Sequence, residues 1–551
     1  MMSKNEHISV RIPSFNENYS EIRRPKSYWR AWNQLSRFQR SLIYMLVIIS
    51  FFMVLYFIPN TDNVILNVDG SERTTINRNV LVGESKHDEV FAGPTNDRQR
   101  AIVEAFRHAW TGYKKFAWGH DNLKPISEGY SEWFGLGLTI VDSIDTIYIM
   151  GLKEGTIVDS IDTIYIMGLK EEYEDARNWI EEHLHFTNNR DVNLFEVTIR
   201  VLGGLLGIYH LTGDRMFLNK ALDLGDRLLP SFATETGIPY SDINLFTKTA
   251  HPPKWSPDSS TAEVTTIQLE FRDLSRASGD PKYENAVRKI SEHIHNLHKQ
   301  DGLVPIFINP NSGQFSYYEY LLKQWLQTGK TIDFFRDDYL QAIDGIQKSL
   351  VKRTLPNGFL FLGELLAGGK DFKPKMDHLT CFLPGTLALG THHGLPTSHL
   401  KLAEELLTTC YQTYAQQPTF LAPEITYFNI PNSENTNDIY VKTNDAHNLL
   451  RPEFIESLWY MHQLNGNSTY QDWGWEIFQA FEKYTKVTNG YTSIGNVRNA
   501  AAVKPKDMME SFFLGETLKY LYLLFGDDPK VLDLDRYVLN SEAHPLPVYN
   551  S

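Results

Sequence analysis

Several carboxylates of this sequence lie in apolar or aromatic surroundings, where an isolated charge is unfavourable. Glu196 follows Leu194 and Phe195 and comes shortly before the apolar run 201–209, and Glu453 follows Pro452. A charged group in such a segment is strongly destabilising unless it is paired or binds something. Other polar residues of this kind are Glu263, Asp377, His378, Glu424, Glu456, Glu510 and Glu516.

Acids of this kind, with few bases nearby, predict a shared acidic cavity. Carboxylate oxygens bind hard cations such as Ca²⁺, and a pair of carboxyl groups can hydrolyse a glycosidic bond. The chain has 67 Asp and Glu residues, so a helix cap or a structural ion pair is the competing interpretation for any single one. The inference therefore depends on the cluster.

The elements that must position these acids are predicted to be paired helices. A glycine followed by a polar residue separates successive helical segments in 212–214, 278–280 and 465–467. Glycine supplies the left-handed C-cap, and Asp or Asn can cap the next helix. Repeated helix pairs each leave an apolar face for a neighbour, so they form a closed α/α toroid or, as the alternative, a linear helical-repeat scaffold.

Composition excludes one class of partner. The chain has 551 residues, of which 42% are hydrophobic, so it can bury at least one large core. Its formal net charge is -14. Because phosphate binding needs a basic face, nucleic acid is not expected as a partner.

The N-terminal region predicts a membrane anchor. Residues 41–58 (SLIYMLVIISFFMVLYFI) carry no charge, and as a helix they reach about 27 Å, just enough to cross a bilayer. A cleaved signal peptide is the alternative, but the run is long and no small-residue cleavage site follows. Six Arg and Lys residues precede it between 23 and 40, so residues 1–40 are expected in the cytosol. Residues 59–97 are polar and are expected to form a luminal stem, followed by a catalytic domain over 98–551.

The compartment decides how the two cysteines, Cys381 and Cys410, are interpreted. In the cytosol they would be two separate thiols, whereas an oxidising lumen favours a single disulfide. A luminal domain would also expose the sequon at 467–469 to glycosylation.

Longer motifs resemble the class I α-1,2-mannosidases, glycoside hydrolase family 47. The resemblance covers essentially all of residues 98–550. The matching segments are 110–121 (WTGYKKFAWGHD), 203–211 (GGLLGIYHL), 375–385 (KMDHLTCFLPG), 448–453 (NLLRPE), 509–516 (MESFFLGE) and 542–545 (EAHP).

The resemblance implies an all-α fold, an (α/α)7 barrel here preceded by a single transmembrane helix, and hydrolysis of α-1,2-linked mannose from high-mannose N-glycans with inversion. It also implies one Ca²⁺, a Cys381–Cys410 disulfide, and residence in the endoplasmic reticulum membrane, with the Golgi membrane as the alternative. By position, Glu196 matches the general acid, Glu453 the proposed general base and Glu424 a further catalytic acid. The residues that match the pocket around mannose and the metal's water shell are Asp162, Arg200, Glu263, His378, Arg451, Glu456, Phe512, Glu516 and Glu542.

This sequence departs from the family pattern at three places. Ser541 stands where the family has a metal-binding threonine and keeps both the hydroxyl and the carbonyl oxygen. Residues 139–154 are repeated identically as 156–171, so Asp145 or Asp162 can take the place of one family Asp; Asp162 is favoured because the second copy runs directly into the next helix.

The third departure concerns catalysis. A family loop of about a dozen residues that ends in a catalytic Asp is missing between Phe315 and Ser316. Losing one positioned acid/base group typically lowers a rate by about 10²–10⁴-fold. A mannose-binding lectin of the same fold is therefore the alternative function.

Overall fold

The computed structural model describes residues 93–151, 169–253, 260–304, 316–366, 371–431 and 436–549. The expected cytosolic tail, membrane segment and nearly all of the stem lie outside these residues. The same holds for 152–168, which includes most of the second copy of the repeat, and for 305–315, which ends where the family loop is missing.

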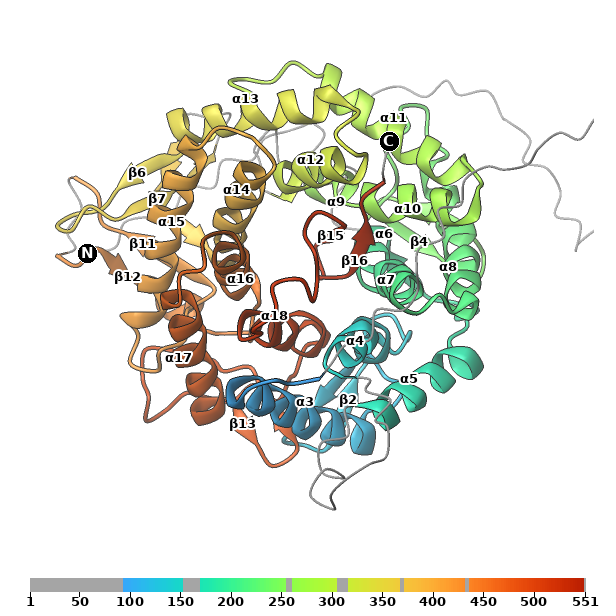
Figure 1. The fold of residues 1–551 in the computed structure, drawn as a ribbon, viewed down its shortest axis with the longest axis horizontal. Helices are drawn as coiled ribbons and strands as arrows, with labels where there is room; N and C mark the ends of the chain where they lie inside the picture. Colours follow the sequence, from blue (N-terminus) through green and yellow to red (C-terminus); the bar gives the residue numbers. More distant parts are fainter. Residues whose placement is uncertain are drawn as a thin grey trace, which may run out of the picture. The chain divides into compact units, whose positions relative to one another are not determined.

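The described helices form a closed ring of two layers (Figure 1). Seven of them make the inner layer: α4 (Leu138–Ile149), α7 (Gly203–Thr212), α10 (Gln268–Ser278), α12 (Ser316–Gln327), α14 (Leu383–His392), α16 (Glu453–Asn465) and α18 (Leu518–Leu524). The outer layer is α3 (Asp97–Phe116), α5 (Lys170–His183), α8 (Arg215–Leu228), α11 (Lys282–Asn296), α13 (Asp333–Ser349), α15 (Ser398–Ala415) and α17 (Thr469–Tyr484). Each inner helix contacts the next, and η6 (Phe513–Thr517), which continues into α18, packs against α4 and closes the ring. The predicted (α/α)7 barrel is confirmed.

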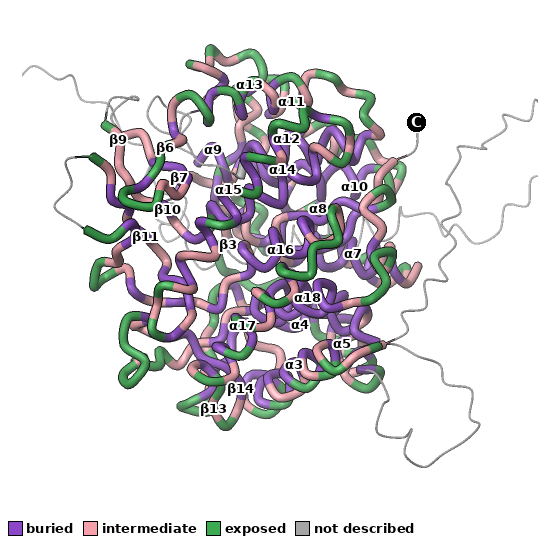
Figure 2. Tube along the Cα trace, turned by 60° about the vertical axis from the view of Figure 1, so that its left-hand side comes forward, coloured by how far each residue is buried: buried purple, intermediate pink, exposed green. Residues whose placement is uncertain are grey.

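The two layers differ in how far their helices are buried (Figure 2). Inner helix α4 is buried at every position except Tyr148, as expected for a helix that is apolar on all sides. Outer helix α11 buries only Tyr283, Val287, Ile290 and Ile294, whose spacing of three or four residues gives one apolar stripe. The sequence pattern thus agrees with the layer in which each of these two helices lies.

Glycine ends several inner helices as the sequence predicted. Gly213, Gly279 and Gly466 have φ values of 70°, 76° and 68° and cap α7, α10 and α16. These left-handed conformations are accessible to glycine at little cost. The side chain of Asp214 then accepts a hydrogen bond from the Met216 amide and starts α8, so each helix pair has a sharp, defined corner.

Short helices fill some of the connections between the long ones. They are α6 (Leu194–Val197), η2 (Thr198–Leu202), η3 (Leu229–Phe232), α9 (Thr261–Thr265), η4 (His378–Phe382) and η5 (Thr443–Asp445). Of these, α6 and η2 lead directly into α7 and carry Glu196 and Arg200.

Short antiparallel strands, which the helical pattern did not predict, form the other connections. The two-stranded sheets pair β1 (Asn122–Lys124) with β2 (Gly129–Ser131), β6 (Val351–Arg353) with β7 (Leu360–Leu362), β8 (Glu364–Leu366) with β9 (Asp371–Lys373), β13 (Lys486–Val487) with β14 (Gly490–Tyr491), and β15 (Tyr537–Leu539) with β16 (Pro545–Pro547). The three-stranded sheets are β3 (Asp191–Asn193), β4 (Asp242–Asn244) and β5 (Thr249–His251), and β10 (Lys375–Asp377), β11 (Ile425–Phe428) and β12 (Ile439–Tyr440).

The last hairpin lies inside the ring of helices (Figure 1). Strand β16 contacts α7 and α10, and β15 contacts α12. In register, Tyr537, Val538 and Leu539 oppose Pro547, Leu546 and Pro545. The turn 540–544 between the two strands is therefore held within the barrel.

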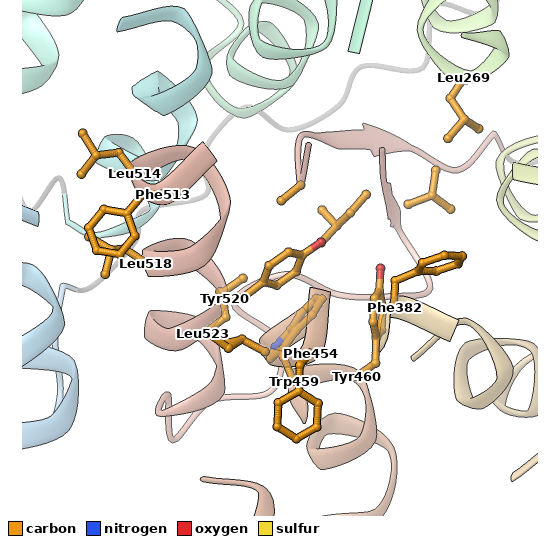
Figure 3. Close-up of a cluster of buried hydrophobic side chains, with 14 of the residues drawn as sticks. Leu269, Phe382, Phe454, Trp459, Tyr460, Phe513, Leu514, Leu518, Tyr520 and Leu523 are labelled. Carbon is orange, nitrogen blue, oxygen red and sulfur yellow. The ribbon is translucent and has the colours of Figure 1, made fainter. Parts of the chain in front are cut away.

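Aromatic side chains pack the inner layer beside this hairpin (Figure 3). The ring of Trp459 lies 4.8 Å from that of Tyr460 and 5.6 Å from that of Tyr520. All three are buried, and aromatic pairs at such distances add to the stability that comes from burial alone. This packing fixes α16 and α18 against each other.

The expected disulfide between Cys381 and Cys410 is present and joins η4 to α15. Its 29-residue separation corresponds to about 3.5 kcal/mol in the chain-entropy treatment of a crosslink.

One helical run within the described residues, Leu194–Thr212, is long and apolar enough to cross a membrane. It is 78% buried inside the protein and forms the inner wall of the barrel, so it is a core helix.

Candidate active site

The turn between β15 and β16 forms one wall of the site. The side-chain oxygen of Asn540 accepts hydrogen bonds from the amides of Glu542 (3.0 Å) and His544 (2.9 Å), and Ala543 has a φ of 61°. The Ser541 amide donates to the Tyr320 hydroxyl at 3.1 Å. The Ser541 hydroxyl and carbonyl oxygens have no hydrogen-bond partner within the part of the chain that the structure describes. Two oxygens of this turn thus have no protein partner among the described residues.

Arg200 connects this turn to the predicted general acid. It lies on η2, a π-helical segment in the wall of the barrel. Its Nη1 donates to Glu542 Oε2 at 2.6 Å, and its Nε donates to Glu196 Oε2 at 3.1 Å. The charges of Glu542, Glu196 and Asp142 overcome burial and raise the pKa of Arg200. The guanidinium therefore remains charged and holds both glutamates in place.

A second group surrounds Glu453 at the start of α16. His378 Nδ1 lies 2.7 Å from Glu453 Oε2, and its Nε2 lies 2.6 Å from the Tyr414 hydroxyl. Arg451 donates from Nε to Glu424 Oε2 at 2.7 Å and from Nη1 to Glu453 Oε1 at 3.4 Å. Burial would raise the pKa of Glu453, but the hydrogen bond to His378 and the charge of Arg451 lower it below its usual range. Glu453 is therefore ionised, as a general base must be.

Phe512 brings the two groups together. The guanidinium carbon of Arg200 lies 5.8 Å from the centroid of its ring, and that of Arg451 lies 5.7 Å from the same centroid. Such distances allow a cation–π contact with each arginine. Arg200 binds Glu196, and Arg451 binds Glu453. These two glutamates therefore face one site, although they are 257 residues apart in the sequence (453 minus 196).

The negative charges of other carboxyl groups of the site are poorly compensated by nearby cationic side chains. Burial, together with the neighbouring Glu542, raises the pKa of Glu516 well above its usual range. Burial raises the pKa of Glu542 to about 7 in spite of Arg200, and that of Glu456 to about 8 in spite of Lys323. Burial also raises the pKa of Glu263, to which the charge of Glu196 adds. A surplus of buried acids is the environment that a bound cation stabilises.

The structure places the first copy of the repeated segment in the wall of the barrel. Asp145 on α4 lies 3.0 Å from Lys519 Nζ and 2.9 Å from His544 Nδ1, and all three side chains are fully buried. The sequence favours Asp162 over Asp145 for the place of the family Asp. Asp162 lies outside the described residues, so this expectation stays a prediction; of the two candidates, the structure describes Asp145, on α4.

Sequence reasoning missed a group of residues that supports Arg200. Asp142 accepts a hydrogen bond from Ser511 at 2.5 Å and lies 3.3 Å from His544 Nε2. Burial opposes ionisation of Asp142, but the hydrogen bond to His544 and the charge of Arg200 lower its pKa. The sequence feature that could have identified this group is Asp142 itself, a charged residue between Val141 and Ser143 in an apolar helix.

This arrangement brings together carboxyl groups of the kind that glycoside hydrolysis uses in pairs, among them Glu196 and Glu453. The Ser541 oxygens lie on a turn beside buried carboxyl groups, and oxygen atoms are the donors that hard cations take. The roles assigned to these residues stay predictions.

Comparison with known proteins agrees with this chemistry. The sequence profile described as glycosyl hydrolase family 47 matches residues 105–156 and 154–548; the two parts meet at the junction of the repeated copies. The endoplasmic reticulum mannosyl-oligosaccharide 1,2-alpha-mannosidase of Homo sapiens is 54% identical over 469 residues, which is 82% of this chain and 64% of that protein. The chain thus spans under two thirds of the human relative's length.

More distant relatives agree as well. A mannosyl-oligosaccharide 1,2-alpha-mannosidase of Arabidopsis thaliana is 45% identical over 513 residues, covering 82% of this chain and 79% of the plant protein. Among solved structures, the alpha-1,2-mannosidase from Trichoderma reesei superposes with a TM-score of 0.73 at 25% identity, covering 83% of this chain and 100% of that one.

Proposed function

Since the chain belongs to glycosyl hydrolase family 47, we propose that it hydrolyses terminal α-1,2-linked mannose from high-mannose N-glycans with inversion at the anomeric carbon. The observation that carries this proposal is the position of Phe512 between Arg200 and Arg451. Each arginine holds one of the two carboxylates that an inverting glycosidase needs. The named relatives are enzymes, which favours hydrolysis over the lectin alternative.

In the proposed reaction the two glutamates have opposite tasks. Glu196 gives a proton to the glycosidic oxygen as the bond to the anomeric carbon breaks. Glu453 takes a proton from a water molecule, whose oxygen bonds to the same carbon from the opposite face. Glu424 shares Arg451 with Glu453 and is proposed to assist in moving that proton. The products are free mannose with inverted configuration and a glycan shorter by one residue.

Ca²⁺ is the proposed cofactor. The hydroxyl and carbonyl oxygens of Ser541 would hold it, with water molecules bound by Glu516, Glu542, Glu456 and Glu263. When bound, the ion would accept oxygen ligands, including hydroxyl groups of mannose, and would compensate the surplus of buried acids. The remaining pocket residues, Arg200, Arg451, His378 and Phe512, orient the sugar and the carboxylates.

Removal of calcium tests this proposal. Treatment with excess EDTA is expected to lower the melting temperature and to abolish mannose release, because the buried carboxyl groups lose their compensating charge. At a free calcium concentration of about 100 Kd, binding contributes about 2.7 kcal/mol of stability. Differential scanning calorimetry measures the shift, and added Ca²⁺ should restore both properties where added Mg²⁺ does not. An identical melting curve with and without EDTA would count against the metal site.

We further propose that residues 41–58 anchor the protein in the endoplasmic reticulum membrane, with the tail 1–40 in the cytosol and the catalytic domain in the lumen. The disulfide supports an oxidising compartment, and Asn467 in the sequon is exposed.

Protease digestion of intact microsomes tests this topology. Only the short N-terminal tail should be removed, and Asn467→Gln should lose one endoglycosidase-sensitive glycan. Digestion of the catalytic domain in sealed vesicles would overturn the orientation.

A further inference from the structure

Glu270 on α10 is a fully buried carboxyl group, and the hydrogen bonds that it makes within the described residues go to none of the residues proposed to hold the sugar or the calcium. Its Oε1 accepts hydrogen bonds from Asn540 Nδ2 at 2.8 Å and from the Tyr320 hydroxyl at 3.0 Å. Its Oε2 is buried and has no hydrogen-bond partner among the residues that the structure describes. Burial raises the pKa of Glu270 to about 7.

Both partners of Glu270 hold the turn that carries Ser541. Tyr320 uses its hydroxyl proton toward Glu270 and accepts the Ser541 amide at 3.1 Å. Asn540 directs its amide nitrogen toward Glu270 and its oxygen toward the Glu542 amide at 3.0 Å. Because the donor and acceptor atoms of the Tyr320 hydroxyl and the Asn540 amide are each assigned by these hydrogen bonds, each group can be oriented in only one way.

The same network reaches the segment that carries Arg200. The amide nitrogen of Asn540 also donates to the backbone carbonyl of Ile199 at 2.8 Å, and Ile199 lies on η2 directly before Arg200. Glu270, through Asn540, therefore connects α10, the Ser541–Glu542 turn and η2.

Retaining a buried carboxyl oxygen without a partner is destabilising, and an apolar side chain of similar size would avoid that loss. We propose that Glu270 is a positioning residue, which holds the Ser541–Glu542 turn through Tyr320 and Asn540 so that the Ser541 oxygens are presented to calcium in register with Arg200. This inference rests on the proposed calcium-dependent function and names a residue that acts on it from outside the site.

Four single variants and one double variant of the full chain, purified in detergent, test the role. Glu270→Gln keeps an oxygen that accepts the same two hydrogen bonds, whereas Glu270→Met keeps the size and removes both. Tyr320→Phe removes the hydroxyl that joins Glu270 to Ser541. Leu274→Ala, also on α10 and fully buried, is the control for a general loss of stability.

The readout is the calcium concentration at half-maximal thermal stabilisation, measured in calcium buffers. Glu270→Met and Tyr320→Phe are each expected to require about tenfold more calcium, the size expected for losing hydrogen bonds of a buried network. Glu270→Gln should stay within about twofold of the parent, and Leu274→Ala should lower the melting temperature without changing the calcium midpoint. The double variant Glu270→Met, Tyr320→Phe should be no worse than the poorer single one, because both remove the same connection.

Each outcome decides the proposal. An unchanged calcium midpoint in both Glu270→Met and Tyr320→Phe overturns it, as does an equal loss in Leu274→Ala. If Glu270→Met does not fold, Tyr320→Phe alone decides in the same way. If the parent itself shows no calcium-dependent stabilisation, the proposed metal site fails. If the parent binds calcium and the variants bind it equally well, only the proposed role of Glu270 fails.

Discussion

Replacement of Glu453 by glutamine is expected to lower kcat by about 10²–10⁴-fold, the usual range for removal of a general base. Glutamine keeps the size of the side chain but cannot accept a proton from water. In the parent protein His378 and Arg451 keep this carboxylate ionised. KM should change much less than kcat, because Arg200 and Phe512, which are proposed to orient the sugar, and the proposed calcium site at Ser541 are unchanged.

The matched control is Glu292→Gln on the outer helix α11, where the side chain is 54% exposed. This variant should keep the parent kcat. Both variants are compared on one α-1,2-mannobiose substrate at saturating calcium. A kcat for Glu453→Gln within about threefold of the parent would remove Glu453 from the role of base and leave Glu424 as the candidate.

Restoration of the missing family loop between Phe315 and Ser316 is expected to raise kcat/KM at least about a hundredfold. In the family pattern this loop ends in a catalytic Asp, and here Phe315 stands in that position of the sequence. Phenylalanine can neither transfer a proton nor accept a hydrogen bond from water. The turn that carries Ser541 and the pocket residues Arg200, Glu453 and Glu542 lie outside the loop, so glycan binding should change less than turnover.

A second insertion separates the chemistry of the Asp from the effect of filling the gap. It carries the same residues, taken from the human relative, with the terminal Asp replaced by Asn. We expect only the Asp version to gain activity. Equal kcat/KM for the original chain and the Asp insertion would show that Glu196 and Glu453 suffice without the additional acid.

The helix pairs could be predicted from the sequence because their corners carry local signals, whereas the closed (α/α)7 ring was implied by the family resemblance, since a linear scaffold fits the same pattern. The glycines at 213, 279 and 466 mark the corners, and burial on one side or on all sides distinguishes outer α11 from inner α4. The short strands were not predicted because segments of two to four residues are too short for a periodic pattern to be detected.

The site could be predicted in part. Acids in apolar segments identified Glu196 and Glu453, and the family resemblance supplied their roles. Contacts between distant segments were not accessible: the position of Phe512 between two arginines and the support of Arg200 by Asp142 and Ser511 depend on closure of the ring. The choice between Asp145 and Asp162 could not be made from the sequence, since identical segments carry no information about which copy lines the site, and Asp162 lies outside the described residues.

The configuration of the released sugar tests the central claim most directly. Proton NMR of the full chain with calcium and the methyl glycoside of α-1,2-mannobiose, whose second product is methyl mannoside and not free mannose, is recorded in the first minutes of reaction. It should show β-mannose appearing before mutarotation produces the α anomer. This order is expected because Glu453 activates water on the face opposite the leaving group. The same signal should be absent in EDTA and in Glu453→Gln. Initial release of α-mannose, or no release even from the loop-restored chain, would contradict the assignment of this protein as a calcium-dependent inverting mannosidase.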